Sequence, residues 1–169
     1  FALDLPGHGK SSGVGSHSIA DYAHHVLEFL DAARLNTAIV VGHSMGSAIA
    51  LTLALDFPKR VLGLGLVGSG ARLRVNPMIL ENTASNSLFP HVIKLINAAE
   101  FSANANPRLK ELAAQRMADI RPSVLHGDFL ACNEFDAMAR LGEISKPTLI
   151  LCGADDILTP VKYSEYLHA

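Results

Sequence analysis

The feature that most constrains the fold is a five-residue segment, Gly42-His43-Ser44-Met45-Gly46, which joins two different hydrophobic patterns. An apolar, β-branched run at 37–41 precedes it and is typical of a buried strand. A helical pattern over 45–57 follows it and ends at Pro58. A chain that passes directly from strand to helix through two glycines and a serine has room only for a very tight turn. The pattern therefore predicts a sharp strand-to-helix turn with Ser44 at its tip.

Ser44 is the candidate nucleophile of this turn. A serine at such a tip takes a strained backbone angle, and its hydroxyl stands clear of the sheet. Gly42 and Gly46 are expected to be steric requirements, since a side chain at either position would collide with the neighbouring strand or helix. The helix N-terminus favours a developing negative charge, and the Met45 N–H is the candidate donor to it. The alternative, in which Ser44 merely caps the helix, does not explain a glycine on each side.

Composition limits the classes of function that remain. The chain has 169 residues, of which 49% are hydrophobic and 18% charged, so it is one domain in size with ample material for a buried core. A net charge of −2 and the lack of a Lys/Arg cluster argue against a nucleic acid or an anionic membrane as partner. No apolar stretch has the length of a membrane span, and no histidine pair has metal-ligand spacing with a third ligand. A small-molecule substrate is the partner that fits.

The two cysteines, Cys132 and Cys152, are too few for a disulfide framework. Both lie in apolar surroundings, which predicts buried free thiols. A reducing compartment, and hence a cytoplasmic location, is expected.

Apolar segments at regular spacing predict a parallel sheet. The predicted strands lie at 1–5, 37–41, 61–67 and 147–152, and the predicted helices beside them lie at 19–33, 45–57 and 160–169. Strands that are nearly all apolar and alternate with helices are typical of a parallel sheet covered on both faces. Ser18, with Asp21 three residues later, predicts the cap of the first helix. The fold class is therefore α/β with a mostly parallel sheet.

The region 72–141 interrupts this alternation, because it contains no convincing strand. Helical segments near 88–103, 108–119 and 123–140 are separated by turns that contain Asn and Pro. We interpret the region as a helical insertion between two strands of the sheet. Residues 1–71 and 142–169 would then form the core, and residues 72–141 a helical cap.

Three separated motifs together carry a family resemblance. They are Asp4-Leu5-Pro6-Gly7-His8-Gly9-Lys10-Ser11, then Gly42-His43-Ser44-Met45-Gly46, and finally Gly153-Ala154-Asp155-Asp156 followed by Thr159-Pro160. Over its whole length the chain resembles the α/β-hydrolase superfamily, and among its members the small esterase-like enzymes with a helical cap. The resemblance implies a Ser-Asp-His triad, transfer of an acyl group to water, a small carboxylic ester or related acyl compound as substrate, and no cofactor.

The resemblance also implies roles for residues at matching positions. Ser44 matches the nucleophile, and the backbone N–H of Met45 matches one donor of the oxyanion hole. Asp156 matches the acid, since it lies three residues after the glycine of its motif and four before the proline; Asp155 is the alternative. His43, inside the turn, matches a packing residue whose side chain points away from the nucleophile.

No histidine of the chain matches the base of the triad. In the family this histidine follows the acid and an eighth strand, whereas the chain ends 13 residues after Asp156. His168 has the right order along the chain but falls in the last predicted helix. The other histidines are assigned to loops, to helix surfaces or to the cap: His8, His17, His24, His25, His91 and His126. We therefore expect the base to lie beyond the chain end.

The second donor of the oxyanion hole is also expected outside the chain. In the family it belongs to a loop after the third strand, and that strand would precede Phe1 and lie between the segments 1–5 and 37–41. The chain is thus expected to be an internal piece of a longer enzyme, inactive by itself. Two alternatives stay open: a carbon–carbon bond hydrolase or perhydrolase with the same triad, and a catalytically inert fragment or binding protein.

Overall fold

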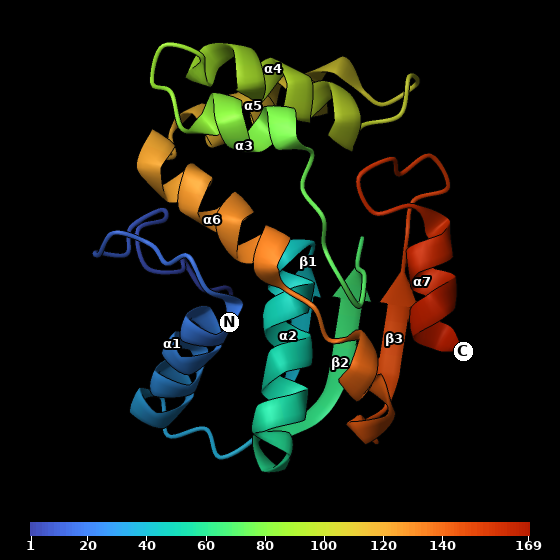
Figure 1. Cartoon of the computed structure of the whole chain (residues 1–169). Coiled ribbons are helices and arrows are strands. Elements are labelled where there is room, and N and C mark those ends of the chain that lie inside the picture. The colour runs from blue at the N-terminus through green and yellow to red at the C-terminus, as the bar shows by residue number, and fades with distance from the viewer.

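Three parallel strands form the centre of the fold (Figure 1). The computed structural model describes all residues from 1 to 169. Strand β1 (Ala38–His43) pairs with β2 (Val61–Val67), which pairs in turn with β3 (Thr148–Leu151). Both pairings are parallel, and the sheet order is β1-β2-β3. The predicted α/β class with a parallel sheet is confirmed.

The helices next to the sheet begin and end close to their predicted positions. Helix α1 spans Ile19–Ala32, α2 spans Met45–Asp56, and α7 spans Val161–His168. The Ser18 side chain accepts a hydrogen bond from the Asp21 N–H, so the predicted cap of α1 is confirmed. A short 3₁₀ helix, η1 (Pro58–Arg60), follows α2 and leads into β2.

The predicted strand at 1–5 is wrong, because this segment pairs with no strand of the sheet. Its polar groups instead bind the turn that follows: the Asp4 carboxylate accepts a hydrogen bond from the Lys10 N–H, and the Asp4 carbonyl accepts one from the Ser11 hydroxyl. A groove of about 430 Å³ lies between the segment and β1, lined by apolar side chains of both. An apolar run becomes a strand only where a neighbour offers backbone hydrogen bonds, and here the groove separates the two.

Only one face of the sheet is covered, so the expectation of two covered faces is also wrong. Helix α2 packs on β1 and β2, and α1 packs on α2. Leu64 and Leu66 of β2 point to this side and are buried. Residues of the opposite face are exposed, with Val41 at 69% and Leu149 at 60%. The register places Val41, Gly65 and Leu149 in one row, which shows that the exposed apolar side chains share that face.

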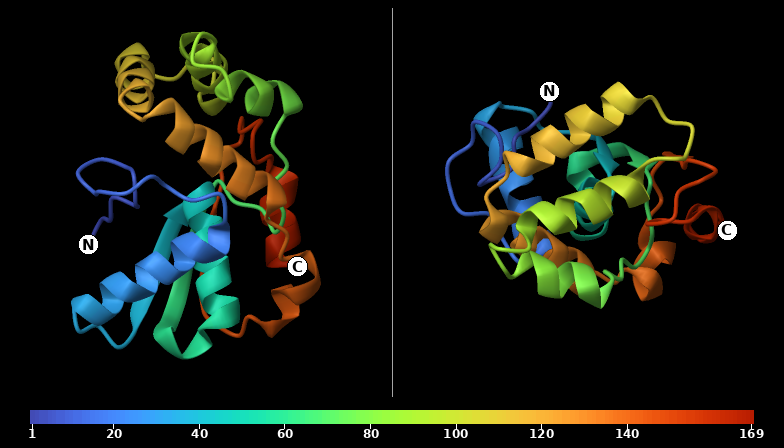
Figure 2. Two further views of the ribbon diagram at one scale, coloured as in Figure 1. Left: turned by 60° about the vertical axis from the view of Figure 1, so that its left-hand side comes forward. Right: turned by 90° about the horizontal axis from the view of Figure 1, so that it is seen from above.

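The segment between β2 and β3 is helical, and all of it except its last short helix lies above the carboxyl ends of the strands (Figure 1). It consists of α3 (Pro77–Thr83), α4 (Phe89–Glu100), α5 (Pro107–Ala118), α6 (Pro122–Glu134) and the 3₁₀ helix η2 (Met138–Glu143). Each of the four α-helices has a proline in its first turn, where no intrahelical N–H is needed. Figure 2 shows α4 and α5 side by side when the molecule is seen from above.

Two details of this helical segment differ from the sequence prediction. The sequence pattern missed α3, which has only seven residues and therefore too few turns for a periodic pattern. The predicted helix over 123–140 ends at Glu134, because the next residues pair with the segment that leaves β2. Asp136 forms an isolated antiparallel bridge with Arg72, and the Ala137 N–H donates to the Ala71 carbonyl at 2.7 Å.

Buried apolar side chains form two separate clusters. The larger one has 19 residues and is centred on α1, α2 and β2. The smaller one has five, Phe89, Val92, Ile93, Ile96 and Leu125, and lies within the helical segment. None of the helices combines the length and the apolar character that crossing a membrane requires.

Candidate active site

The turn at Ser44 has the strained geometry that its sequence predicts. Ser44 lies between the last residue of β1 and the first residue of α2, with φ of 51° and ψ of −116°. This is a sparsely populated conformation for any residue other than glycine, and it persists only where the surroundings enforce it. The Ser44 N–H donates to the Val67 carbonyl at the end of β2, 2.9 Å away, which holds the tip of the turn against the sheet.

The structure explains the two glycines of the turn in different ways. A Cβ on Gly42 would lie 2.0 Å from the Gly46 carbonyl oxygen, so the helix backbone leaves no space for a side chain at this position. A Cβ on Gly46 would meet nothing within 4 Å. Gly46 instead lines the groove beside β1. The predicted steric requirement therefore applies to Gly42 and is wrong for Gly46.

The Ser44 side chain does not cap α2, so the capping alternative is wrong. It accepts no hydrogen bond from the first turn of the helix. The Ser44 carbonyl closes that turn, accepting from the Ser47 hydroxyl at 2.6 Å and from the Ser47 N–H at 2.9 Å. Met45 is the first residue of α2, so its N–H has no acceptor within the helix. The Ser44 hydroxyl and the Met45 N–H thus lie at the positive end of the helix dipole.

Ser44 borders a cavity of about 410 Å³ between the strand ends and the helical segment. Ten of the 14 lining residues are hydrophobic, and they come from the chain after β2, from α3, α4 and α6, and from the loop after β3. Met78, Phe129 and Leu158 are among them. Such a cavity suits an apolar group whose reactive end reaches Ser44.

Asp156 lies in the loop after β3, and this loop fixes its carboxylate. Oδ1 accepts from the backbone N–H groups of Leu158 and Thr159 at 2.9 and 2.7 Å, and Oδ2 accepts from the Thr159 hydroxyl at 2.8 Å. Asp155 is exposed, and its side chain makes no hydrogen bond. Of the two carboxylates that the sequence left open, Asp156 is the one held in a fixed orientation.

Gly68 lies between the candidate acid and His43. A Cβ on Gly68, which has φ of +51°, would lie 3.3 Å from Asp156 Oδ2 and 3.3 Å from His43 Nε2. His43 is the last residue of β1 and is exposed, on the open side of the sheet. Its ring makes no hydrogen bond with Ser44 or Asp156, as expected for a residue of the turn that points away from the nucleophile.

None of the other histidines forms a hydrogen bond with Ser44 or Asp156. His8 binds Asp128, His24 binds the Ala20 carbonyl, His25 binds Glu28, and His126 binds the Thr83 hydroxyl. His168 is the last residue of α7. The described contacts thus bring together Ser44, the N-terminus of α2 and the loops at the strand ends. They include no hydrogen bond from an imidazole that could act as the base.

Comparison with known proteins decides which family this geometry belongs to. The sequence matches the family described as alpha/beta hydrolase fold, and the match covers residues 1–169. The chain belongs to the α/β-hydrolase family. As in other α/β hydrolases, the turn after β1 and the loops after β2 and β3 meet at the carboxyl edge of a parallel sheet.

Several relatives of this α/β hydrolase are named as hydrolases or esterases. RutD of Variovorax paradoxus (strain S110), whose name gives it as a carbamate hydrolase, is 32% identical over 99% of this chain and 67% of its own length. The pimeloyl-[acyl-carrier protein] methyl ester esterase of Neisseria meningitidis serogroup B is 29% identical over 99% of this chain and 68% of its own. A solved structure of a thermophilic esterase is 38% identical, with a TM-score of 0.85, and the match covers 97% of this chain and 64% of that one. The α/β hydrolase therefore spans about two thirds of the length of the proteins it resembles.

A buried polar cluster joins the helical segment of this α/β hydrolase to its core, and local sequence patterns gave no signal for it. Asp128 of α6 accepts a hydrogen bond from the Tyr22 hydroxyl and contacts His8 Nε2 at 2.8 Å. The Tyr22 hydroxyl in turn accepts from the Ser16 N–H. The hydrogen bond with Asp128 raises the pKa of His8 above its ordinary value of 6.5, against the opposing effect of burial. We name this set of side chains, His8, Tyr22 and Asp128, the clasp.

The cysteines of the α/β hydrolase are both free, as predicted. Cys132 is buried and borders the Ser44 cavity, and burial raises the pKa of its thiol to about 12. A thiol with so high a pKa stays protonated near neutral pH and is a poor nucleophile. Cys152 is only half-buried, so the expectation of burial is wrong for this residue.

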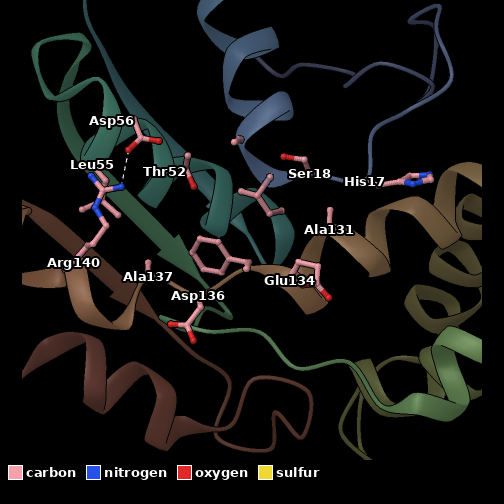
Figure 3. A pocket seen from close by; sticks show the side chains of 13 residues that line it. His17, Ser18, Thr52, Leu55, Asp56, Ala131, Glu134, Asp136, Ala137 and Arg140 are labelled. Carbon is pink, nitrogen blue, oxygen red and sulfur yellow. Dashed lines mark hydrogen bonds and ion pairs between the residues drawn. The ribbon is translucent and has the colours of Figure 1, made fainter.

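A separate cavity of about 260 Å³ lies between α1, α2, α6 and η2 (Figure 3). Asp56 and Arg140 form an ion pair of 2.7 Å at its edge. Neither Ser44 nor Asp156 lines it. No group of three His, Cys, Asp or Glu side chains in the chain is arranged to hold a metal ion.

Proposed function

We propose that this chain carries the nucleophile and the acid of a serine hydrolase that cleaves a small carboxylic ester or a related acyl compound. The observation that carries the proposal is the strained turn that places the Ser44 hydroxyl at the N-terminus of α2 and at the wall of an apolar cavity. The names of the esterases among the relatives support an ester as substrate.

In this proposal Ser44 Oγ attacks the carbonyl carbon of the ester. The Met45 N–H and the dipole of α2 stabilise the negative charge that develops on the carbonyl oxygen. Asp156 orients the histidine that takes the Ser44 proton, because its carboxylate is already held by the loop after β3. That histidine, and the second oxyanion donor, are assigned to residues outside these 169.

The helical segment would act as a cap over the reacting carbonyl. Met78 and Phe129 of this segment line the Ser44 cavity together with Leu158 of the core. We propose that residues 72–141 form the cap, that residues 1–71 and 142–169 form the core, and that the cap side chains set the size of the acyl or alcohol group that fits.

Hydrolysis of a p-nitrophenyl ester by the chain, with and without added imidazole, tests the proposal. Without imidazole we expect the rate to equal that of Ser44→Ala, because the chain supplies no base. With imidazole as replacement base, we expect a rate at least about tenfold above that of Ser44→Ala. Ser87→Ala, which removes the hydroxyl of an exposed serine in the helical segment, should behave as the unchanged chain.

The two results address different parts of the proposal. Equal rates for the chain and Ser44→Ala in the presence of imidazole would contradict Ser44 as nucleophile. Turnover that depends on Ser44 in the absence of imidazole would contradict the assignment of the base to residues outside the chain.

A further inference from the structure

Arg74 is the one charged residue that borders the otherwise largely apolar Ser44 cavity. It also borders a second, smaller cavity of about 230 Å³. The linings of the two cavities therefore have this residue in common. A molecule that fills the apolar cavity can reach Arg74 without leaving the protein surface.

The smaller cavity carries an excess of positive charge. Arg72, Arg74 and Lys162 line it, together with the aromatic rings of Tyr163 and Tyr166. Asp136 is the carboxylate that faces both arginines. Two arginines thus share one carboxylate, and Lys162 forms no ion pair, in a chain whose overall charge is −2.

The ion pairs in this cationic cavity are loose compared with others in the molecule. The distances from Asp136 Oδ2 to the nearest guanidinium nitrogen of Arg72 and of Arg74 are both 3.7 Å. The Arg60–Asp31 and Arg140–Asp56 pairs are 2.7 Å long. Asp136 Oδ1 is already bound to the Met138 N–H at 3.0 Å. One carboxylate therefore cannot satisfy both guanidinium groups.

Arg74 keeps donors for a ligand. Its Nη1 donates to the Asn133 carbonyl at 2.5 Å, which fixes the side chain at the end of α6, and its Nε–H makes no hydrogen bond within the protein. The Arg74 side chain is 51% exposed, so an incoming ligand meets little steric resistance. A planar guanidinium with free N–H groups is suited to a carboxylate or a phosphate.

From these observations we propose that Arg74, with Arg72 and Lys162, binds an anionic group of the substrate. This inference rests on the proposed function of Ser44. The substrate class is an ester with an apolar chain of moderate length whose far end carries a carboxylate or a phosphate. The apolar chain lies in the Ser44 cavity and the charged end lies in the cationic cavity.

Equilibrium binding to the Ser44→Ala variant tests this inference without any turnover. Three probes of similar length are titrated by calorimetry: monoethyl adipate, ethyl 6-(phosphonooxy)hexanoate and the uncharged diethyl adipate. We expect at least one charged ester to bind about tenfold or more tightly than the diester, with a smaller difference at raised salt. The charged ester that binds more tightly shows whether the site prefers a carboxylate or a phosphate.

The arginine is tested in the same Ser44→Ala background. Arg74→Gln should remove the preference for the charged ester, and Lys162→Gln, at an exposed position, should reduce it. Arg108→Gln, an exposed arginine of α5 without an ion pair, is the matched control and should keep it. Retention of the preference in Arg74→Gln overturns the inference, as does equal or absent binding of charged and neutral esters. Because these titrations do not use the Ser44 hydroxyl, they can fail or succeed independently of the proposed nucleophile.

Discussion

At the scale of single residues, the tip of the turn combines a strained backbone with a close approach of strand and helix. Ser44 has a positive φ, and Gly42 lies so near the helix that its Cα faces the Gly46 carbonyl. Strain of this kind is retained where surrounding contacts enforce it, and here the Ser44 N–H is held by the Val67 carbonyl. The sequence motif thus encodes a geometry that brings Ser44 to the wall of a cavity.

The two glycines of the turn predict opposite responses to the same substitution. Gly42→Ala should destabilise the chain by more than about 3 kcal/mol, since the new methyl group would overlap backbone atoms that cannot move without disrupting α2. Gly46→Ala has open space and a helical position, so it should be neutral or stabilising by up to about 1 kcal/mol. Urea unfolding of both variants measures the difference. Equal stability of the two variants would contradict the assigned geometry.

At the scale of elements, the clasp is the polar link between α6 and the core. Asp128 joins α6 to Tyr22 of α1 and to His8 of the N-terminal loop. Asp128 is 7% exposed, and its two oxygens are both used. Loss of a partner would leave a buried carboxylate under-satisfied, which is costly.

The clasp predicts a pH dependence of stability through His8. Its pKa is raised in the folded chain by Asp128, so the protonated form is favoured by folding. The resulting stability is fully present below the unfolded pKa of about 6.5 and is lost as the pH rises through the raised pKa. His8→Gln does not titrate, so the free energy of unfolding of the unchanged chain should exceed that of His8→Gln by about 1 to 3 kcal/mol at low pH. This excess should decrease as the pH is raised.

Urea unfolding of the two proteins at about pH 5.5 and about pH 8.5 measures this decrease. Asp128→Asn serves as the control, because without the carboxylate the stability difference caused by His8 should no longer depend on pH in this way. A difference between the unchanged chain and His8→Gln that grows with pH would contradict the ion pair.

The elements also show where sequence reasoning succeeds and where it fails. β1, β2, α1 and α2 were predicted because their causes are local: apolar periodicity, the Ser18 cap and the glycines of the turn. The segment 1–5 has the same apolar character, but strand formation needs a partner, which sequence periodicity does not report. The end of α6 at Glu134 depends on the bridge between Asp136 and Arg72, two residues far apart in the chain.

The candidate site likewise contains residues that the sequence predicts and residues that it does not. Ser44, Met45 and Asp156 were found from motifs whose residues are close in sequence. Arg74 and Asp128 lie in no such motif, and their surroundings arise from contacts between distant segments. The different roles of Gly42 and Gly46 also required coordinates, because the two residues look equivalent in the motif.

At the scale of the whole molecule, three strands with one covered face form the base on which the turn and loops are placed. The exposed face presents Ile39, Val41, Leu149 and Leu151, and the groove beside β1 is lined by apolar side chains. The chain nevertheless holds Ser44, Gly68 and Asp156 at one edge of the sheet, because three parallel strands end there. The placement of the nucleophile thus depends on the β1–β2–β3 sheet and on α2.

The most direct test of the central claim is to find which serine reacts with a fluorophosphonate. The full chain is incubated with the reagent, with and without imidazole as added base, and the modified residue is located by mass spectrometry. The account predicts an adduct on Ser44 that forms slowly alone and at least about tenfold faster with imidazole, and none at that position in Ser44→Ala. An adduct on a different serine, or no adduct on Ser44 under either condition, would contradict it.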